Sequence, residues 1–390
     1  MEITGAPHAS TTPDVEAARP TGVLELTHSP PYLTQPAGGP GTQLSWVGLD
    51  HAPADTTLIT AITDFVDHAG IDHAHIDGHS HIDLTEVPHV ARAIADADGL
   101  LAEWSAMATV AAHGLTLARV VEPDVDALTI LAASDTPLAD DVDALTWGVF
   151  AAEGRGRRLE AHHTDRGWEL TGSKPWCSLA HRLDRALVTA WTSAQSRRLF
   201  AIDLTRPDVT VGDDPWVARG LVTVESPSIT CQQTPATPVG DDGWYLRRPG
   251  FAEGGIRVAA IWFGAAVGLG RTLRDASARP DLDQIGCLHL GAVDSALYAA
   301  RCVLRDAAMR VSWPDTDPWV VALHARRAVR EAAEDVLRHT HHALGPTPLV
   351  RDEQHAARVA DLTVYLRQEH AERDAAALGS RVHDGKGLVL

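Results

Sequence analysis

The sequence predicts an α+β protein in which a small β-domain is set between two helical regions. Residues 88–118 and 251–377 are rich in alanine, and their apolar residues recur at helical spacing. From about residue 145 this period changes, alanine becomes scarce and β-branched residues become more frequent. The chain has 390 residues, enough for two or three domains.

The charge and the cysteines exclude several classes of protein. A formal net charge of -19 argues against nucleic-acid binding, which needs a basic surface. We find no apolar run long enough to span a bilayer and no basic-then-apolar leader, so we expect a soluble, cytoplasmic protein without a membrane partner. The four cysteines are scattered, which indicates free or buried thiols in a reducing compartment.

The N-terminal part is expected to be helical. Residues 1–20 are polar and contain proline and glycine, which predicts a disordered tail. An N-terminal helical domain follows over residues 21–144. Within it we expect helices at 55–65 and 88–118 and a short helix from Glu122.

The β-domain is expected over residues 145–246. Residues 157–172 are typical of a hairpin whose turn is Asp165-Arg166-Gly167. Further strands are predicted at 185–192, 197–204 and 228–240, separated by polar turns.

The remaining residues, 247–390, predict a four-helix bundle. The first helix resumes near Phe251 and is apolar on nearly all sides, so it should be buried. The other helices are expected at 285–311, from Pro318 to Gly345 with Asp317 as the N-cap, and at 353–377. Small residues of the first helix should allow close backbone approach: Gly264, Ala265, Ala266, Gly268 and Gly270.

The most informative segment is LTGSKPWCS, residues 170–178. A strand ends in Thr171-Gly172, and Lys-Pro-Trp then leads into a small polar pair. An indole beside a hydroxyl at a strand edge suits a ring system that needs one apolar face and one hydrogen bond. A flavin is such a ring. The alternative interpretation is a core tryptophan followed by a serine at a strand end.

This layout and its motifs resemble the acyl-CoA dehydrogenase family. Trp176 and Ser178 stand where that family packs an indole against the flavin and places a hydroxyl near flavin N5. WGVFAAEGRG, residues 147–156, stands where the family has aromatic-x-Val-Thr-Glu-Pro-x-x-Gly-Ser-Asp. The resemblance implies flavin contacts from Trp147, Val149 and the backbone of Phe150. Four residues depart from the family's Thr, Glu, Pro and Ser: Phe150, Ala151, Ala152 and Gly156.

The resemblance also assigns a catalytic base. Gly345 lies sixteen positions before Asp361, which fits the family's Gly-Gly loop followed by Arg-Asp. In many members a glutamate eight positions after that aspartate removes the substrate's α-proton while hydride leaves the β-carbon for the flavin. The resemblance gives this role to Glu369, with His370 or Glu372 as alternatives. An ordinary solvated helix charge is the competing interpretation.

Contacts to the adenylate half of FAD are implied for Arg279 and for Gln284 or His289, from a neighbouring subunit. A solvated arginine at a helix end is the alternative for Arg279. The family's arginine that contacts CoA has no aligned counterpart, because Arg257 is offset. A carrier-bound pantetheine arm is therefore an alternative to CoA.

The histidine-rich stretch at residues 67–83 does not predict a metal site. His73 and His75, and likewise His79 and His81, alternate as two ligands on a strand would. No paired cysteines and no His-Glu-x-x-His motif accompany them, so we expect an exposed loop.

The resemblance thus implies an acyl-CoA dehydrogenase-like fold: an N-terminal helical domain, a central β-barrel domain and a C-terminal four-helix bundle. It implies FAD between the last two and a homodimer or homotetramer. The expected function is α,β-dehydrogenation of an acyl thioester, with an electron-transfer partner or oxygen as acceptor. Two alternatives stay open: a flavin monooxygenase or oxidase on the same fold, and a non-catalytic family member that binds a partner.

Overall fold

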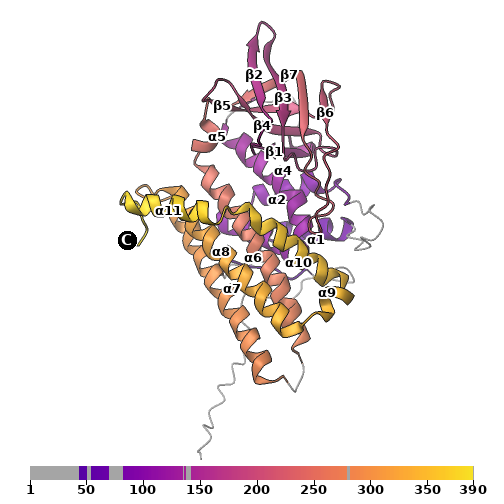
Figure 1. Ribbon diagram of the computed structural model, residues 1–390, viewed down its shortest axis with the longest axis vertical. Helices are drawn as coiled ribbons and strands as arrows, with labels where there is room; N and C mark the ends of the chain where they lie inside the picture. Colours follow the sequence, from indigo (N-terminus) through magenta and orange to yellow (C-terminus); the bar gives the residue numbers. More distant parts are fainter. Residues whose placement is uncertain are drawn as a thin grey trace, which may run out of the picture. The chain divides into compact units, whose positions relative to one another are not determined.

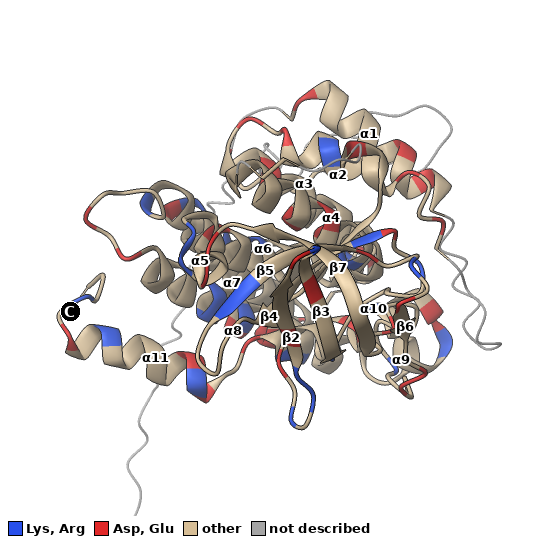
Figure 2. Cartoon of the chain, turned by 90° about the horizontal axis from the view of Figure 1, so that it is seen from above, with Lys and Arg blue, Asp and Glu red and all other residues tan. Residues whose placement is uncertain are grey.

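Helices, then strands, then helices follow one another along the chain, as the sequence predicts (Figure 1). The computed structural model describes residues 44–50, 54–69, 82–134, 136–137, 142–278 and 282–389. The predicted tail, most of the histidine-rich stretch and Arg279 lie outside these residues. Basic and acidic residues are interspersed over the described elements (Figure 2).

Within the described residues, four α-helices precede the β-domain: α1 (Thr56–His68), α2 (Val87–Ala95), α3 (Leu100–His113) and α4 (Leu115–Ser134). The prediction of one helix over 88–118 is wrong, because two glycines interrupt it. Gly99 has φ 84°, outside the helical region, and Gly114 is extended at φ -162° and ψ 119°. The chain therefore turns twice where the apolar spacing alone predicts continuity.

Five strands of the β-domain close into a barrel, in the order β4-β2-β3-β7-β5 and back to β4. β1 pairs in parallel with β4, and β6 pairs with β7. The predicted hairpin is confirmed, since Thr164 pairs with Gly167 across the turn. The strands are β1 (Trp147–Phe150), β2 (Leu159–Thr164), β3 (Gly167–Lys174), β4 (Arg185–Trp191), β5 (Arg197–Asp203), β6 (Val209–Val211) and β7 (Ile229–Val239).

The barrel is attached to the helices through an apolar cluster outside its wall. Trp147, Leu187 and Val239 pack there with Ile130 of α4. A second and larger cluster runs from the barrel interior, which includes Phe200, through the helices. Apolar packing against α4 therefore holds the sheet in place in addition to the loops that connect its strands.

The predicted bundle is confirmed, and α6, α7, α8 and α10 pack side by side (Figure 1). Asp317 caps α8 by accepting from the backbone N–H of Trp319 at 3.0 Å, and Gly345 ends it with φ 64°. The helices are α5 (Trp244–Arg247), α6 (Gly250–Ala276), α7 (Gln284–Arg310), α8 (Pro318–Leu344), α9 (Thr347–Arg351), α10 (Glu353–Tyr365) and α11 (Glu372–His383).

The fourth predicted bundle helix, 353–377, is wrong in one respect. The chain leaves the helix after Tyr365, passes through a single 3₁₀ turn (Leu366–Gln368) and restarts at Glu372. At the break Glu369 is extended and buried, and its carboxylate forms an ion pair with Arg330. This buried ion pair requires a bend that helical periodicity does not reveal.

The glycines of α6 allow it to approach α3, as predicted. A Cβ added at Gly264 would lie 2.1 Å from the carbonyl oxygen of Ala108, and one at Gly268 would lie 2.7 Å from that of Ala112. Only glycine fits where two helix backbones come this close.

By length and mean hydropathy, α6 and α7 are both long and apolar enough to cross a membrane. The expectation that no such run exists is therefore wrong, because many small apolar residues together give a high mean. The apolar stretch of α6 is 83% buried by the rest of the protein, as in the core helix of a bundle, and that of α7 is 28% buried.

His113 at the end of α3 predicts a loss of stability in acid. Its Nε2 accepts from the backbone N–H of Ser45 at 3.3 Å, and burial, followed by Arg271 and Arg358, lowers its pKa to about 4. The unfolded chain binds this proton near pH 6.5, so the folded state should lose stability as the pH falls from 6.5 to 4, by up to about 3 kcal/mol.

Denaturant unfolding at several pH values measures this loss. His113→Gln should flatten the curve between pH 6.5 and 4, whereas His181→Gln, at an exposed position, should leave it unchanged. Equal pH dependence in all three proteins would contradict the assignment.

Candidate functional site

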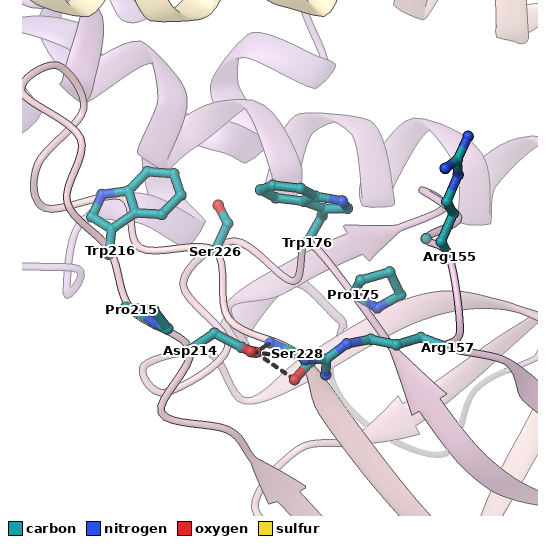
Figure 3. A pocket seen from close by; sticks show the side chains of 10 residues that line it. Arg155, Arg157, Pro175, Trp176, Asp214, Pro215, Trp216, Ser226 and Ser228 are labelled. Carbon is teal, nitrogen blue, oxygen red and sulfur yellow. Dashed lines mark hydrogen bonds and ion pairs between the residues drawn. The ribbon is translucent and has the colours of Figure 1, made fainter.

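A cavity of about 350 Å³ opens where three connections of the β-domain meet (Figure 3). These are the connections β1–β2 (151–158), β3–β4 (175–184) and β6–β7 (212–228). The cavity is lined by Gly154, Arg155, Arg157, Pro175, Trp176, Asp214, Pro215, Trp216, Ser226 and Ser228.

Trp176 holds a strained backbone conformation at this cavity. Its φ is 61°, in the left-handed region that bulky side chains rarely adopt, and its side chain is left 59% exposed. Such strain persists only where the surroundings impose it, and it concentrates at functional sites. A large apolar ring presented to solvent at this cost is a candidate binding surface.

Backbone hydrogen bonds impose the conformation of Trp176. The N–H of Cys177 donates to the carbonyl of Pro227 at 2.7 Å, and the N–H of Leu179 donates to that of Glu225 at 2.8 Å. The hydroxyls of Ser178 and Ser226 share a hydrogen bond at 2.8 Å. The β3–β4 and β6–β7 connections therefore hold one another, and Ser226 is the hydroxyl-bearing residue of this pair that lines the cavity.

A buried lysine fixes the third connection. Lys174 Nζ donates to Glu153 at 2.7 Å and to the Thr189 hydroxyl at 2.8 Å. Burial lowers the pKa of Lys174, while Glu153 opposes that shift. Gly154 then passes so close to Pro175 that a Cβ would lie 2.8 Å from the proline ring. The β1–β2 connection is thus pressed against the one that carries Trp176.

The polar edge of the cavity contains two arginines with different roles. Arg157 forms an ion pair with Asp214 at 2.9 Å. Asp214 also accepts from the hydroxyl and the N–H of Ser228, at 2.5 and 2.6 Å, and these bonds and Arg157 lower its pKa. Arg155 is exposed and forms no ion pair with a described residue. Its guanidinium can therefore meet an anionic group of a ligand.

Glu369 lies outside this lining, at the break before α11. Its side chain is buried, and its Oε2 is 2.9 Å from Arg330 Nε and accepts from the N–H of Ala371 at 3.0 Å. Its Oε1 has no hydrogen-bond partner among the described residues. One carboxylate oxygen is thus held in place by hydrogen-bond donors of the described residues, and the other is not.

A buried group of charges lies where α3, α4, α6 and α10 meet. Arg257 pairs with Glu103 at 2.5 Å and with Asp126. The Tyr365 hydroxyl donates to Glu122, and burial, followed by Glu122, raises the pKa of this tyrosine well above its usual value. Tyr365 therefore stays protonated at neutral pH.

Solved structures share this arrangement of helices and barrel. Butyryl-CoA dehydrogenase from Megasphaera elsdenii matches with a TM-score of 0.72 at 16% identity, over 85% of this chain and 99% of that one. KijD3 in complex with FMN and dTDP-3-amino-2,3,6-trideoxy-4-keto-3-methyl-D-glucose matches with a TM-score of 0.70 at 16% identity, over 86% and 96%. Dibenzothiophene monooxygenase TdsC from Paenibacillus sp. A11-2 matches at 0.68 and 15% identity, over 84% and 96%.

The chain has the acyl-CoA dehydrogenase fold. No protein-family model matches the sequence. No curated protein matches it either. At this level of identity the fold is shared and the reaction is not decided, since one fold supports several chemistries.

On this acyl-CoA dehydrogenase fold, the residues predicted to contact the flavin ring do not all lie at the cavity. Trp147 and Phe150 are buried in apolar clusters, and the Trp147 indole donates to the carbonyl of Val142 at 3.1 Å. Val149 is half-buried. Of the residues predicted from the sequence, Trp176 lines the cavity, and Ser178 reaches it through Ser226.

The residues predicted for the adenylate half are not brought to the cavity. His289 Nδ1 lies 2.9 Å from His339 Nδ1, and its ring also meets His342. Gly345 ends α8, and Arg279 lies outside the described residues. Within the described part of the chain, no group of three possible ligands is placed to hold a metal ion.

Sequence reasoning missed Trp216, Arg155, Arg157, Asp214, Ser226 and Ser228. One signal was present: Pro-Trp occurs at 175–176, at 215–216 and at 318–319. The first two dipeptides line this cavity, whereas the third begins α8. The pairing of the connections could not be read from the sequence, because it depends on the barrel bringing them together.

The strain at Trp176 predicts an unusual response to substitution. Asparagine tolerates the left-handed region, so Trp176→Asn should unfold with the same free energy or with up to about 1 kcal/mol more. Trp168→Asn is the matched control, because the ring centroids of Trp168 and Phe200 lie 5.3 Å apart. Losing that packing should lower the free energy of unfolding by about 2 kcal/mol or more. Chemical denaturation measures both. An equal loss in the two variants would show that Trp176 is an ordinary structural residue.

Proposed function

We propose that this chain is a flavin-dependent oxidoreductase. The observation that carries the proposal is Trp176, whose strained backbone holds an indole exposed at the edge of a cavity. An aromatic ring lying on that indole would gain apolar contact and favourable stacking. KijD3, which has the same fold, was solved in complex with FMN, which supports the assignment.

The residues present fit such a group. A cavity of about 350 Å³ is within the range of small-molecule sites and suits a ring system with one side group. Ser226 offers a hydroxyl between the two indoles, and Arg155 offers a free guanidinium for a phosphate. We propose FAD, as the family resemblance implies, and the binding experiment below includes FMN. The contacts proposed from Trp147, Val149, Phe150, Ser178, Arg279, His289 and Gly345 rest on that resemblance.

The first candidate reaction is α,β-dehydrogenation of an acyl thioester. When bound, a flavin supplies a two-electron acceptor for the hydride. Glu369 would take the α-proton, because its Oε1 is buried and has no hydrogen-bond donor among the described residues. Arg330 and the N–H of Ala371 would keep the carboxylate oriented while it does so.

The second candidate reaction is oxygen-dependent, as in a flavin monooxygenase or oxidase. This candidate needs no carboxylate base, and it would leave Glu369 as a structural residue held by its ion pair with Arg330. TdsC is, by name, a monooxygenase on this fold.

The proposed partners follow from the resemblance and from α7. We propose a cytoplasmic homodimer or homotetramer that passes electrons to a partner protein or to oxygen. Only 28% of the apolar stretch of α7 is buried. The helix exposes several large apolar side chains: Ile285, Leu288, Tyr298 and Met309. Self-association would cover that face.

The visible spectrum tests the proposed function. Protein incubated with FAD or with FMN and then desalted should retain a yellow chromophore. Trp176→Ala should weaken flavin binding roughly tenfold, because a ring loses its stacking surface. Trp313→Ala, at an exposed indole on the α7–α8 connection, is the control and should bind as the unaltered protein does. Colourless protein that takes up neither flavin would support the non-catalytic alternative.

The base is tested by Glu369→Gln, with Glu372→Gln and His370→Gln as matched controls. If Glu369 takes the α-proton, its replacement should lower turnover of acyl thioesters by roughly 10²–10⁴-fold and leave flavin binding intact. The neighbouring variants should remain active. Flavin bleaching by a panel of acyl thioesters measures the rate, and unchanged turnover in Glu369→Gln would favour the oxygen reaction.

A further inference from the structure

A second indole lines the cavity opposite the one that carries the proposed function. Trp216 follows Pro215 in the β6–β7 connection, as Trp176 follows Pro175 in the β3–β4 connection. Figure 3 shows both indoles on the same side of the strand ends, with Ser226 between them. A planar ligand longer than one indole can therefore reach both.

Trp216 is held by a chain of hydrogen bonds. Its indole Nε1 donates to the carbonyl of Leu221 at 3.1 Å. The N–H of Leu221 donates to Asp361 Oδ1 at 2.6 Å, and Leu221 has a φ of 53°. A non-glycine residue keeps this conformation where its surroundings impose it. The ring orientation of Trp216 thus depends on where Leu221 is anchored.

The anchor belongs to the helical bundle. Asp361 lies on α10 and is 9% exposed. Its Oδ2 accepts from the hydroxyl of Thr116 on α4 at 2.7 Å. Next to Leu221, a Cβ at Gly220 would lie 2.1 Å from the carbonyl oxygen of Ala360, so the connection rests on the backbone of α10. One buried carboxylate therefore joins α10, α4 and the connection that carries Trp216.

The two indoles consequently belong to different parts of the fold. Trp176 is fixed at the end of β3, beside the β6–β7 backbone, whereas Trp216 is fixed through Asp361 to α10 and α4. A ring that stacks on both would be bound by the barrel and by the bundle together. Its affinity would then depend on a residue that does not line the cavity.

We propose that Trp216 is a second ring-binding residue and that Asp361 is the positioning residue that places it. This inference rests on the proposed function, since the ring is the flavin's. It assigns the flavin two aromatic contacts, one from each part of the fold. Asp361 acts through Leu221 and Trp216.

A double-mutant cycle tests the inference, with FAD and FMN as the probes. Trp216→Ala should weaken flavin binding roughly tenfold and increase the fluorescence of the bound flavin, because an indole near the ring quenches it. Asp361→Asn should weaken binding by a similar factor in the unaltered protein. It should have little further effect in the Trp216→Ala background, since its action passes through that indole.

Two further variants guard against a general folding defect. Trp313→Ala should change neither affinity nor fluorescence. If Asp361→Asn fails to fold, Thr116→Val serves instead: it removes the donor to Oδ2, leaves the bond to Leu221, and should give a smaller loss of affinity with a smaller rise in fluorescence.

The outcomes separate the two proposals. Flavin binding by the unaltered protein together with unchanged affinity and fluorescence in Trp216→Ala would overturn this inference alone. An equal loss from Asp361→Asn in both backgrounds would overturn the positioning role. Failure of the unaltered protein to bind either flavin would overturn the proposed function and this inference with it.

Discussion

The helical body depends on the close approach of α3 to α6, where Gly264 lies against the carbonyl of Ala108. This contact embeds α6 among the other helices, so that it is buried on nearly every side. It also brings Arg257 of α6 to Glu103 of α3 and Asp126 of α4, which neutralise its buried charge. Because the barrel packs on α4, its position follows from the same contact.

The connections around the cavity are held in place by both the barrel and the bundle. The barrel supplies strand ends and the buried Lys174, which hold two connections together, whereas the bundle supplies Asp361, which holds the third. Both indoles depend on residues in the left-handed region, Trp176 itself and Leu221 beside Trp216. These two strained backbone conformations persist because the large apolar core stabilises the fold enough to offset their cost.

The break before α11 connects the fold to the proposed chemistry. In a continuous helix, Glu369 would be one more helical residue. Instead, the chain becomes extended after the 3₁₀ turn, and the Glu369 carboxylate is buried beside Arg330. Helix α10, which precedes the break, carries Asp361 and, one turn later, Tyr365, whose hydroxyl donates to Glu122. One face of α10 and the turn after it thus join the wall of the cavity to the charged interior.

From the amino-acid sequence alone we could predict the order of helices and strands, the hairpin at 165–167, the ends of α8 and Trp176 as a candidate site residue. These follow from local rules: periodicity, capping residues, turn residues and the chemistry of one short motif. The folded structure was needed to show that α10 ends at Tyr365, that Ser226 rather than Ser178 lines the cavity, and that Trp216 lies there too. Those features depend on contacts between residues far apart in the sequence, through a buried carboxylate or a paired backbone, and a local sequence pattern carries no record of such contacts.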